Sequence, residues 1–261
     1  MNIIDIHNHI YPDKIAQKAT DSIRQFYGLE GSHMDGTTDL LVRRSQEAGI
    51  SRQVILPVAI RPNHVQEIND FVRRQADEHE SFIPFFTVHA AMDGIMDETE
   101  RMLKLGMRGL KLHPDSSRFT IDDMRLFPVY EALRGKVPVL IHMGDQRYNY
   151  SHPIHLRRIL DLFPGLTVIG AHFGGYSMYE TAYELLKDTD CVMDISSSLM
   201  LMEKGIPEDF ISRYGAERIA FGSDYPLWDP VQEVARFLQL DLTGVQFEQI
   251  ACKTAARILG L

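Results

Sequence analysis

The chain has 261 residues, of which 44% are hydrophobic and 24% charged, and its formal net charge is −9. The length suits one α/β barrel, and the acidic balance argues against nucleic acid or an anionic membrane as the main partner. No apolar run approaches the roughly 18 residues of a membrane span, and no signal peptide is evident. The two cysteines form no C-x-x-C pair, so we expect a cytoplasmic protein without a disulfide framework.

Eight short apolar runs alternate with longer amphipathic segments. The predicted strands begin near residues 2, 52, 82, 107, 137, 166, 191 and 218. Apolar residues at helical spacing predict helices over 64–79, over 93–106 with Asp93 as its N-cap, and over 152–165. This alternation predicts an α/β fold, a (β/α)8 TIM barrel, as a single domain over residues 1–261. The stretch 13–38 is predicted to be an irregular insertion placed to cover the barrel mouth.

The first strand reads "IIDIHNHIYP" and carries Asp5, His7 and His9 at alternate positions. In an extended strand these three side chains share one face, and Ile4 and Ile6 point to the other. Two imidazoles on an inward face are costly to bury unpaired and are good metal ligands. Asp5 has two readings, as an acceptor that orients a histidine or as a turn contact at the barrel floor.

Polar side chains also follow the later strands, at the ends where barrel enzymes carry their catalytic groups. More than half of the 11 histidines lie at such ends. In chain order the residues at these ends are His7, His9, His89, Lys111, His113, His142, His172 and Asp224. Imidazoles and a carboxylate converging from different strands predict a divalent metal site, while His89, followed by two alanines, is expected to be structural.

The D-x-H-x-H motif and the phrases "GLKLHP", "GAHFGG" and "FGSDYP" resemble the amidohydrolase superfamily, in this order along the chain. They look most like its amidohydrolase-related branch, which includes aminocarboxymuconate-semialdehyde decarboxylase-like enzymes. The resemblance implies a barrel of the metallo-dependent hydrolase type with one divalent metal, usually zinc, with manganese as the alternative. By this match the ligands would be His7, His9, His142 and Asp224. His172 would be a nearby acid/base or oxyanion-polarising residue.

Lys111 leaves the number of metal ions open. Dihydroorotase-like relatives carry a carboxylated lysine in a similar context, where it bridges two metals, and His172 would then bind the second ion. The alternative is an ion pair between Lys111 and an acidic neighbour inside the barrel. His113 alternates with Lys111 along the strand, so we expect both at the pocket and one metal as the main case.

These residues predict a metal-dependent hydrolase that cleaves an amide, ester or lactone with a metal-activated water. Asp224 would move the proton, and His172 would stabilise the oxyanion. The alternative is a non-oxidative decarboxylase of a small carboxylic acid at the same mononuclear site. A metal-free lactonase or binding barrel is the third reading. For a small-molecule substrate, Arg147 is a candidate partner of a carboxylate and Tyr225 a candidate lining residue. The oligomeric state stays open, with a homo-oligomer as one outcome.

Overall fold

The structure is a computed structural model, and it describes residues 2–29 and 34–261. Its strands are β1 Ile3–Asn8, β2 Ile50–Ile55, β3 Phe82–Pro84, β4 Phe86–Thr87, β5 Leu110–Leu112, β6 Val139–Ile141, β7 Val168–Gly170, β8 Val192–Asp194 and β9 Ile219–Ala220. All neighbouring strands pair in parallel, in the orders β1-β2-β3 and β4 to β9. Since β3 and β4 are the two halves of one predicted strand, the eight predicted strands are confirmed.

Backbone hydrogen bonds join the two sheets into a barrel. Phe85 N–H donates to Ile55 C=O at 3.0 Å, and Phe86 N–H donates to Gly109 C=O at 2.9 Å, so one extended segment bonds both β2 and β5. On the other side, Ile6 N–H donates to Phe221 C=O at 3.0 Å, next to a parallel bridge between Asn8 and Tyr225. The predicted TIM-barrel architecture is therefore confirmed.

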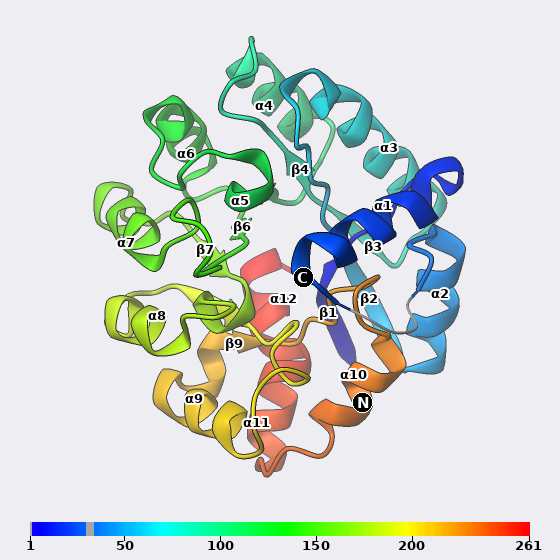
Figure 1. The fold of residues 1–261 in the computed structure, drawn as a ribbon, viewed down its shortest axis with the longest axis vertical. Helices are drawn as coiled ribbons and strands as arrows, with labels where there is room; N and C mark the ends of the chain where they lie inside the picture. The colour runs from blue at the N-terminus through cyan, green and yellow to red at the C-terminus, as the bar shows by residue number, and fades with distance from the viewer. Residues whose placement is uncertain (1, 30–33) are drawn as a thin grey trace.

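Helices surround the strands (Figure 1). They are α1 Asp13–Tyr27, α2 Thr38–Glu47, α3 Val65–Glu78, α4 Ile95–Lys104, α5 Pro114–Ser117, α6 Phe127–Leu133, α7 Pro153–Leu162, α8 Tyr179–Leu186, α9 Ile206–Tyr214, α10 Pro230–Phe237, α11 Gly244–Glu248 and α12 Thr254–Leu259. Helices α3, α4 and α7 confirm the three predicted ones. The predicted cap of α4 is wrong by one residue, because Gly94, with φ 66°, takes the N-cap position in place of Asp93.

The segment predicted as an irregular insertion is a helix over most of its length. Helix α1 buries Ala16, Thr20 and Arg24, four residues apart, and ends at Gly28 with φ 65°. Ile15, Ala19 and Ile23 recur at four-residue spacing, so the helical period is present in the sequence, and the prediction of an irregular segment, which rested on its glycine and polar content, is wrong. In Figure 1 the C-terminal end of α1 reaches the centre of the ring of strands, as predicted for a segment over the mouth. Residues 30–33 of the predicted insertion lie outside the described residues.

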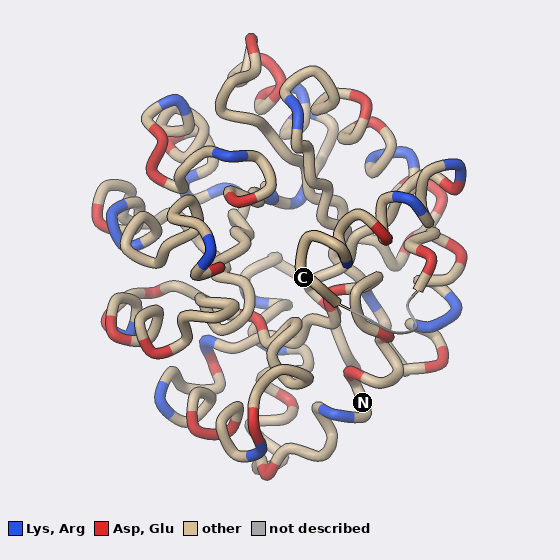
Figure 2. The backbone as a smooth tube through the Cα atoms, viewed as in Figure 1, with Lys and Arg blue, Asp and Glu red and all other residues tan. Residues whose placement is uncertain are grey.

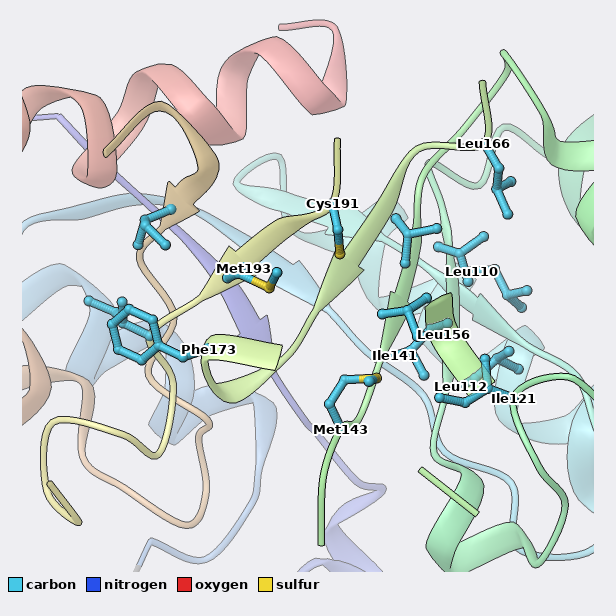
Figure 3. Packing of buried hydrophobic residues seen from close by; sticks show 14 of the residues in the cluster. Leu110, Leu112, Ile121, Ile141, Met143, Leu156, Leu166, Phe173, Cys191 and Met193 are labelled. Carbon is cyan, nitrogen blue, oxygen red and sulfur yellow. The ribbon is translucent and has the colours of Figure 1, made fainter. Parts of the chain in front are cut away.

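Two apolar layers hold the barrel. Inside it, Ile4 and Ile6 pack with side chains of the other strands and with Ala255 and Leu259 of α12. Between strands and helices lies the larger layer, where Figure 3 shows Leu110 and Ile141 near Leu156 of α7 and Met193 near Cys191. Ile4 and Ile6 thus point into the barrel. The predicted strict alternation of side chains between the two faces of β1 does not hold as far as His9, because the register of the strand shifts between Asp5 and Asn8.

Charged residues of both signs are interspersed around the outer helices (Figure 2). No helix in the part of the chain that the structure describes is long and apolar enough to cross a membrane.

Phe85 offers a test of the inner layer. Its side chain is fully buried, and a Cβ added at Gly109 would lie 2.3 Å from its ring, so the ring packs directly on the backbone of the neighbouring strand. We expect Phe85→Ala to lower the free energy of unfolding by about 3–5 kcal/mol, measured by urea denaturation. Leu162→Ala, at a side chain 58% exposed, is the control and should change it by less than about 1 kcal/mol. Equal effects of the two substitutions would contradict this packing.

Candidate metal centre and active site

The carboxyl ends of the strands bring the predicted polar residues together inside the barrel mouth. His7, Lys111, His142, His172 and Asp224 are all at most 5% exposed, and His9 is 9% exposed. Buried polar groups need partners, so the hydrogen bonds among these side chains decide what each one can bind.

Three donor atoms converge. His7 Nε2 and His9 Nε2 each lie 3.6 Å from Asp224 Oδ1. Among the described residues these three form one of two groups whose ligand atoms all lie within 4.8 Å of one another, and the other joins His7, His172 and Asp194. Imidazole nitrogens with a carboxylate oxygen are the donor set that zinc and similar divalent metals take.

The outer nitrogens of both histidines have acceptors. His7 Nδ1 lies 2.8 Å from Asp194 Oδ2, and His9 Nδ1 lies 2.7 Å from Leu56 C=O. Each Nδ1 therefore carries the proton, and each Nε2 presents a lone pair on the side of Asp224. Such an acceptor behind a histidine is the usual support of a metal ligand. The residues present fit one divalent ion held by His7, His9 and Asp224.

The protonation states agree with this fit. Burial is the main cause that lowers the pKa of His9 to about 3, helped by the nearby Lys111 and His7. Burial alone would raise the pKa of Asp224, but the adjacent His7, His172 and His9 outweigh it and hold the pKa at about 2. Neutral imidazole and ionised carboxylate are the forms that bind a metal.

Two residues of the site have left-handed backbone. His172 has φ 60° and Asp224 has φ 63°, a region that non-glycine residues rarely adopt and that clusters at functional sites. Gly222 precedes this turn, and a Cβ there would lie 2.9 Å from His7 Cβ. The glycine of "FGSD" is thus required, because any side chain at this position would clash with His7.

A second chain of hydrogen bonds links four rings. His113 Nδ1 accepts from Ser116 N–H, so its Nε2–H can donate to Tyr27 Oη at 3.0 Å. Tyr27 lies 3.4 Å from His142 Nε2, whose other nitrogen, Nδ1, lies 3.0 Å from His172 Nε2. His172 Nδ1 lies 2.8 Å from the Ser196 carbonyl, which can only accept.

Each of the three imidazoles in this series can therefore be neutral, with one donor and one acceptor nitrogen. Burial is the main cause that lowers the pKa of His113, His142 and His172. His142, the fourth predicted ligand, stacks on His113 with ring centroids 4.0 Å apart and belongs to neither group of three. In this arrangement His172 Nε2 accepts a hydrogen bond from His142 Nδ1–H. The expected contact of His172 with an oxyanion stays a prediction.

Lys111 lies among the metal donors. Its Nζ is 3.2 Å from His7 Nε2, and it is fully buried. Burial lowers its pKa to about 8, although Asp194 and Asp224 act in the opposite direction. Among the described residues it forms no ion pair within 4 Å, and its pairing with an acidic neighbour stays a prediction. A carboxylated Lys111 stays a prediction.

Two predicted substrate residues have protein partners. Arg147 pairs with Asp145 through Nη2 and Oδ2 at 2.6 Å and donates to the Phe26 carbonyl at 2.7 Å. It thereby ties the loop after β6 to the end of α1. Tyr225 is fully buried, and its hydroxyl donates to the Thr37 carbonyl at 2.8 Å, so the turn after β9 is anchored to the start of α2.

Sequence reasoning missed Asp194 and Tyr27. Asp194 ends the run "CVMD" as Asp224 ends "FGSD", so the rule that singled out the second would also have found the first. Tyr27 gave no signal, because it lies at the end of helix α1 and not at the end of a strand. Asp5, for which two readings were open, accepts from the backbone N–H of His7 and of Ser223 and contacts neither ring by hydrogen bond.

Comparison with known proteins decides the family. The family model described as amidohydrolase matches residues 4–261. The chain belongs to this amidohydrolase family. A search of the curated proteins gives no match. The resemblance read from the motifs is therefore confirmed.

Solved structures with the same fold cover nearly the whole chain. An uncharacterised TIM-barrel protein from Bordetella bronchiseptica has a TM-score of 0.85 at 22% identity and covers 100% of this chain and 99% of its own. A dihydroxybenzoic acid decarboxylase from Polaromonas, with bound manganese and 2-nitroresorcinol, has a TM-score of 0.76 at 17% identity, covering 100% and 98%. The 5-carboxyvanillate decarboxylase of Novosphingobium aromaticivorans, complexed with manganese, has a TM-score of 0.76 at 16% identity, covering 99% and 96%.

Two of these neighbours are named as decarboxylases, which is the reaction class of the alternative expectation. Two of them hold manganese, so zinc as the expected metal has no specific support among them. At these identities the likeness establishes the fold, and the reaction of this chain is a separate question.

The neutral histidines make stability depend on pH. Burial keeps the pKa of His113 well below its usual 6.5, so below pH 6.5 the unfolded chain binds a proton that the folded chain does not. The free energy of unfolding therefore falls as the pH falls. In protein treated with EDTA, we expect His113→Gln to make this dependence shallower by about 1.4 kcal/mol per pH unit between pH 5 and 6, measured by urea denaturation. Identical slopes in both proteins would contradict a neutral His113.

Proposed function

We propose that this chain is a metal-dependent, non-oxidative decarboxylase of a small aromatic carboxylic acid that carries a hydroxyl group beside the carboxylate. The observation that carries the proposal is the convergence of His7 Nε2, His9 Nε2 and Asp224 Oδ1 in a buried barrel mouth. Decarboxylases of dihydroxybenzoate and carboxyvanillate share the fold over the whole chain, which supports this reaction class.

His7, His9 and Asp224 would hold one divalent ion, manganese or zinc. The ion would supply positive charge that holds the carboxylate and hydroxyl oxygens of the substrate. Lys111 is the one lysine side chain that the described residues place among these donors, and burial lowers its pKa to about 8. Its Nζ lies 3.2 Å from His7 Nε2, so a protonated Lys111 would place a hydrogen-bond donor for an anionic oxygen beside the metal ligands.

Asp224 would move the proton. Its pKa of about 2 keeps the carboxylate ionised, so it must first take a proton, which the substrate hydroxyl would supply. Asp224 then delivers that proton to the ring carbon that bears the carboxylate. The carbon–carbon bond breaks, its electron pair stays on the ring, and carbon dioxide leaves. One proton from solvent restores the hydroxyl, so the sum is carboxylate plus one proton giving product plus carbon dioxide.

The enclosed mouth would suit this chemistry. Arg147 holds the end of α1 through the Phe26 carbonyl, which places Tyr27 over His113 and His142. The guanidinium also lies 4.9 Å from the Phe26 ring centroid. A covered site excludes water, and this would protect the negatively charged substrate ring from side reactions.

Hydrolysis is the second candidate, favoured by the position of Asp224. A carboxylate that adjoins the metal donors and stays ionised can also act as the base for a metal-activated water. The two reactions differ in product, because only decarboxylation releases carbon dioxide.

The test uses purified protein stripped with EDTA and reloaded with manganese or zinc. We expect it to release carbon dioxide from 2,6-dihydroxybenzoate or 5-carboxyvanillate only when metal is present. Asp224→Asn should lower the rate at least about 100-fold, since an amide cannot relay the proton. Asp241→Asn removes an exposed carboxylate that is not among the residues of the site, and this variant should keep full activity.

Metal-dependent hydrolysis of an amide, ester or lactone panel without carbon dioxide release would favour the second candidate. A lack of metal binding, measured by elemental analysis, would contradict both and leave the metal-free readings.

A further inference from the structure

The two carboxylate oxygens of Asp224 face different partners. Oδ1 lies 3.6 Å from the Nε2 atoms of both His7 and His9. Oδ2 accepts a hydrogen bond from the Ser197 hydroxyl, and Ser197 is 2% exposed. One oxygen is therefore directed at the metal donors, and the other is held by a side chain from the loop after β8.

Trp228 sets the direction of this hydrogen bond. Its Nε1–H lies 2.8 Å from Ser197 Oγ, and an indole nitrogen can only donate. Ser197 thus accepts from Trp228 and turns its own proton to Asp224. The result is a directed chain from Trp228 through Ser197 to the carboxylate, built from three residues on two neighbouring loops.

The backbone around this chain is fixed independently. Asp224 N–H donates to His7 C=O at 2.8 Å, and Leu227 N–H donates to Asp224 C=O at 2.9 Å. Asp224 with φ 63° and Ser197 with φ 54° both hold left-handed conformations. With the main chain pinned, rotation of the carboxylate about its side-chain bonds is the remaining freedom, and Ser197 restrains it.

We propose that Ser197 and Trp228 are positioning residues that hold Asp224 with one oxygen toward the metal, and that Trp228 reports metal binding through this chain. The inference rests on the metal site of the proposed function. Trp228 is the one tryptophan of the sequence, so all indole fluorescence of this protein comes from the residue that donates to Ser197.

The experiment measures metal binding without any substrate. Manganese affinity is measured from the electron paramagnetic resonance signal of free Mn²⁺, and Trp228 emission is followed during titration with Zn²⁺, which is diamagnetic. The variants are Ser197→Ala, Ser197→Gly and Trp228→Phe. Glycine adopts a positive φ without strain, so agreement between the first two would separate loss of the hydroxyl from any change in backbone strain.

We expect both Ser197 variants to bind manganese about 10- to 100-fold more weakly than the wild type, the usual cost of losing a partner behind a metal ligand. Trp228→Phe should weaken binding less, because Ser197 remains. Zn²⁺ should change the wild-type emission until one equivalent is bound and should change that of Ser197→Ala much less at saturation.

Ser198→Ala is the matched control. Ser198 is also buried in this loop, but its hydroxyl donates to the Ser196 carbonyl at 3.1 Å. This variant should keep the wild-type affinity within about twofold, and thermal unfolding of the metal-free proteins should show that all of them fold.

Wild-type manganese affinity in both Ser197 variants would overturn the proposal. So would a wild-type emission that ignores Zn²⁺ while elemental analysis shows the metal bound. If the affinities follow the expected order but no carbon dioxide is released, the proposed reaction fails and the positioning role stands. Failure of the wild type to bind either metal would overturn both.

Discussion

The site depends on one constraint, which is that each imidazole nitrogen packed inside a barrel needs a hydrogen-bond partner or a metal. Burial removes the water that would stabilise a charged ring. The protein answers with fixed acceptors behind the rings, namely Asp194 behind His7, the Leu56 carbonyl behind His9 and the Ser196 carbonyl behind His172. These acceptors decide which nitrogens have free lone pairs, and so where a metal fits.

A second constraint shapes the backbone at the mouth. His172 and Asp224 follow strands that must deliver a side chain inward and then turn away at once, and both turns use positive φ. Bonds from neighbouring strands hold these conformations, such as Asp224 N–H to His7 C=O. The barrel therefore carries local strain where its functional groups lie, and the apolar layers on both sides of the strands stabilise it.

Much of this site was predictable from strand ends. In a parallel barrel all carboxyl ends meet at one mouth, so a polar residue after an apolar run is placed there wherever the run stands in the chain. This rule located His7, His9, Lys111, His142 and Asp224 before any coordinates. It does not reach Tyr27, because this residue lies at the end of helix α1 and not at the end of a strand.

The sequence by itself determined the barrel, the family and the set of residues at its mouth, because hydrophobic runs and strand ends are local properties. Only the tertiary structure decided how those residues divide. It brought His7 and His9 together with Asp224 and placed His142 in hydrogen-bond contact with His172. It also showed that Arg147 and Tyr225 form hydrogen bonds that connect loops to helices. Such choices depend on hydrogen-bond partners from distant strands and on a register shift in β1, and neither can be read from spacing along one segment.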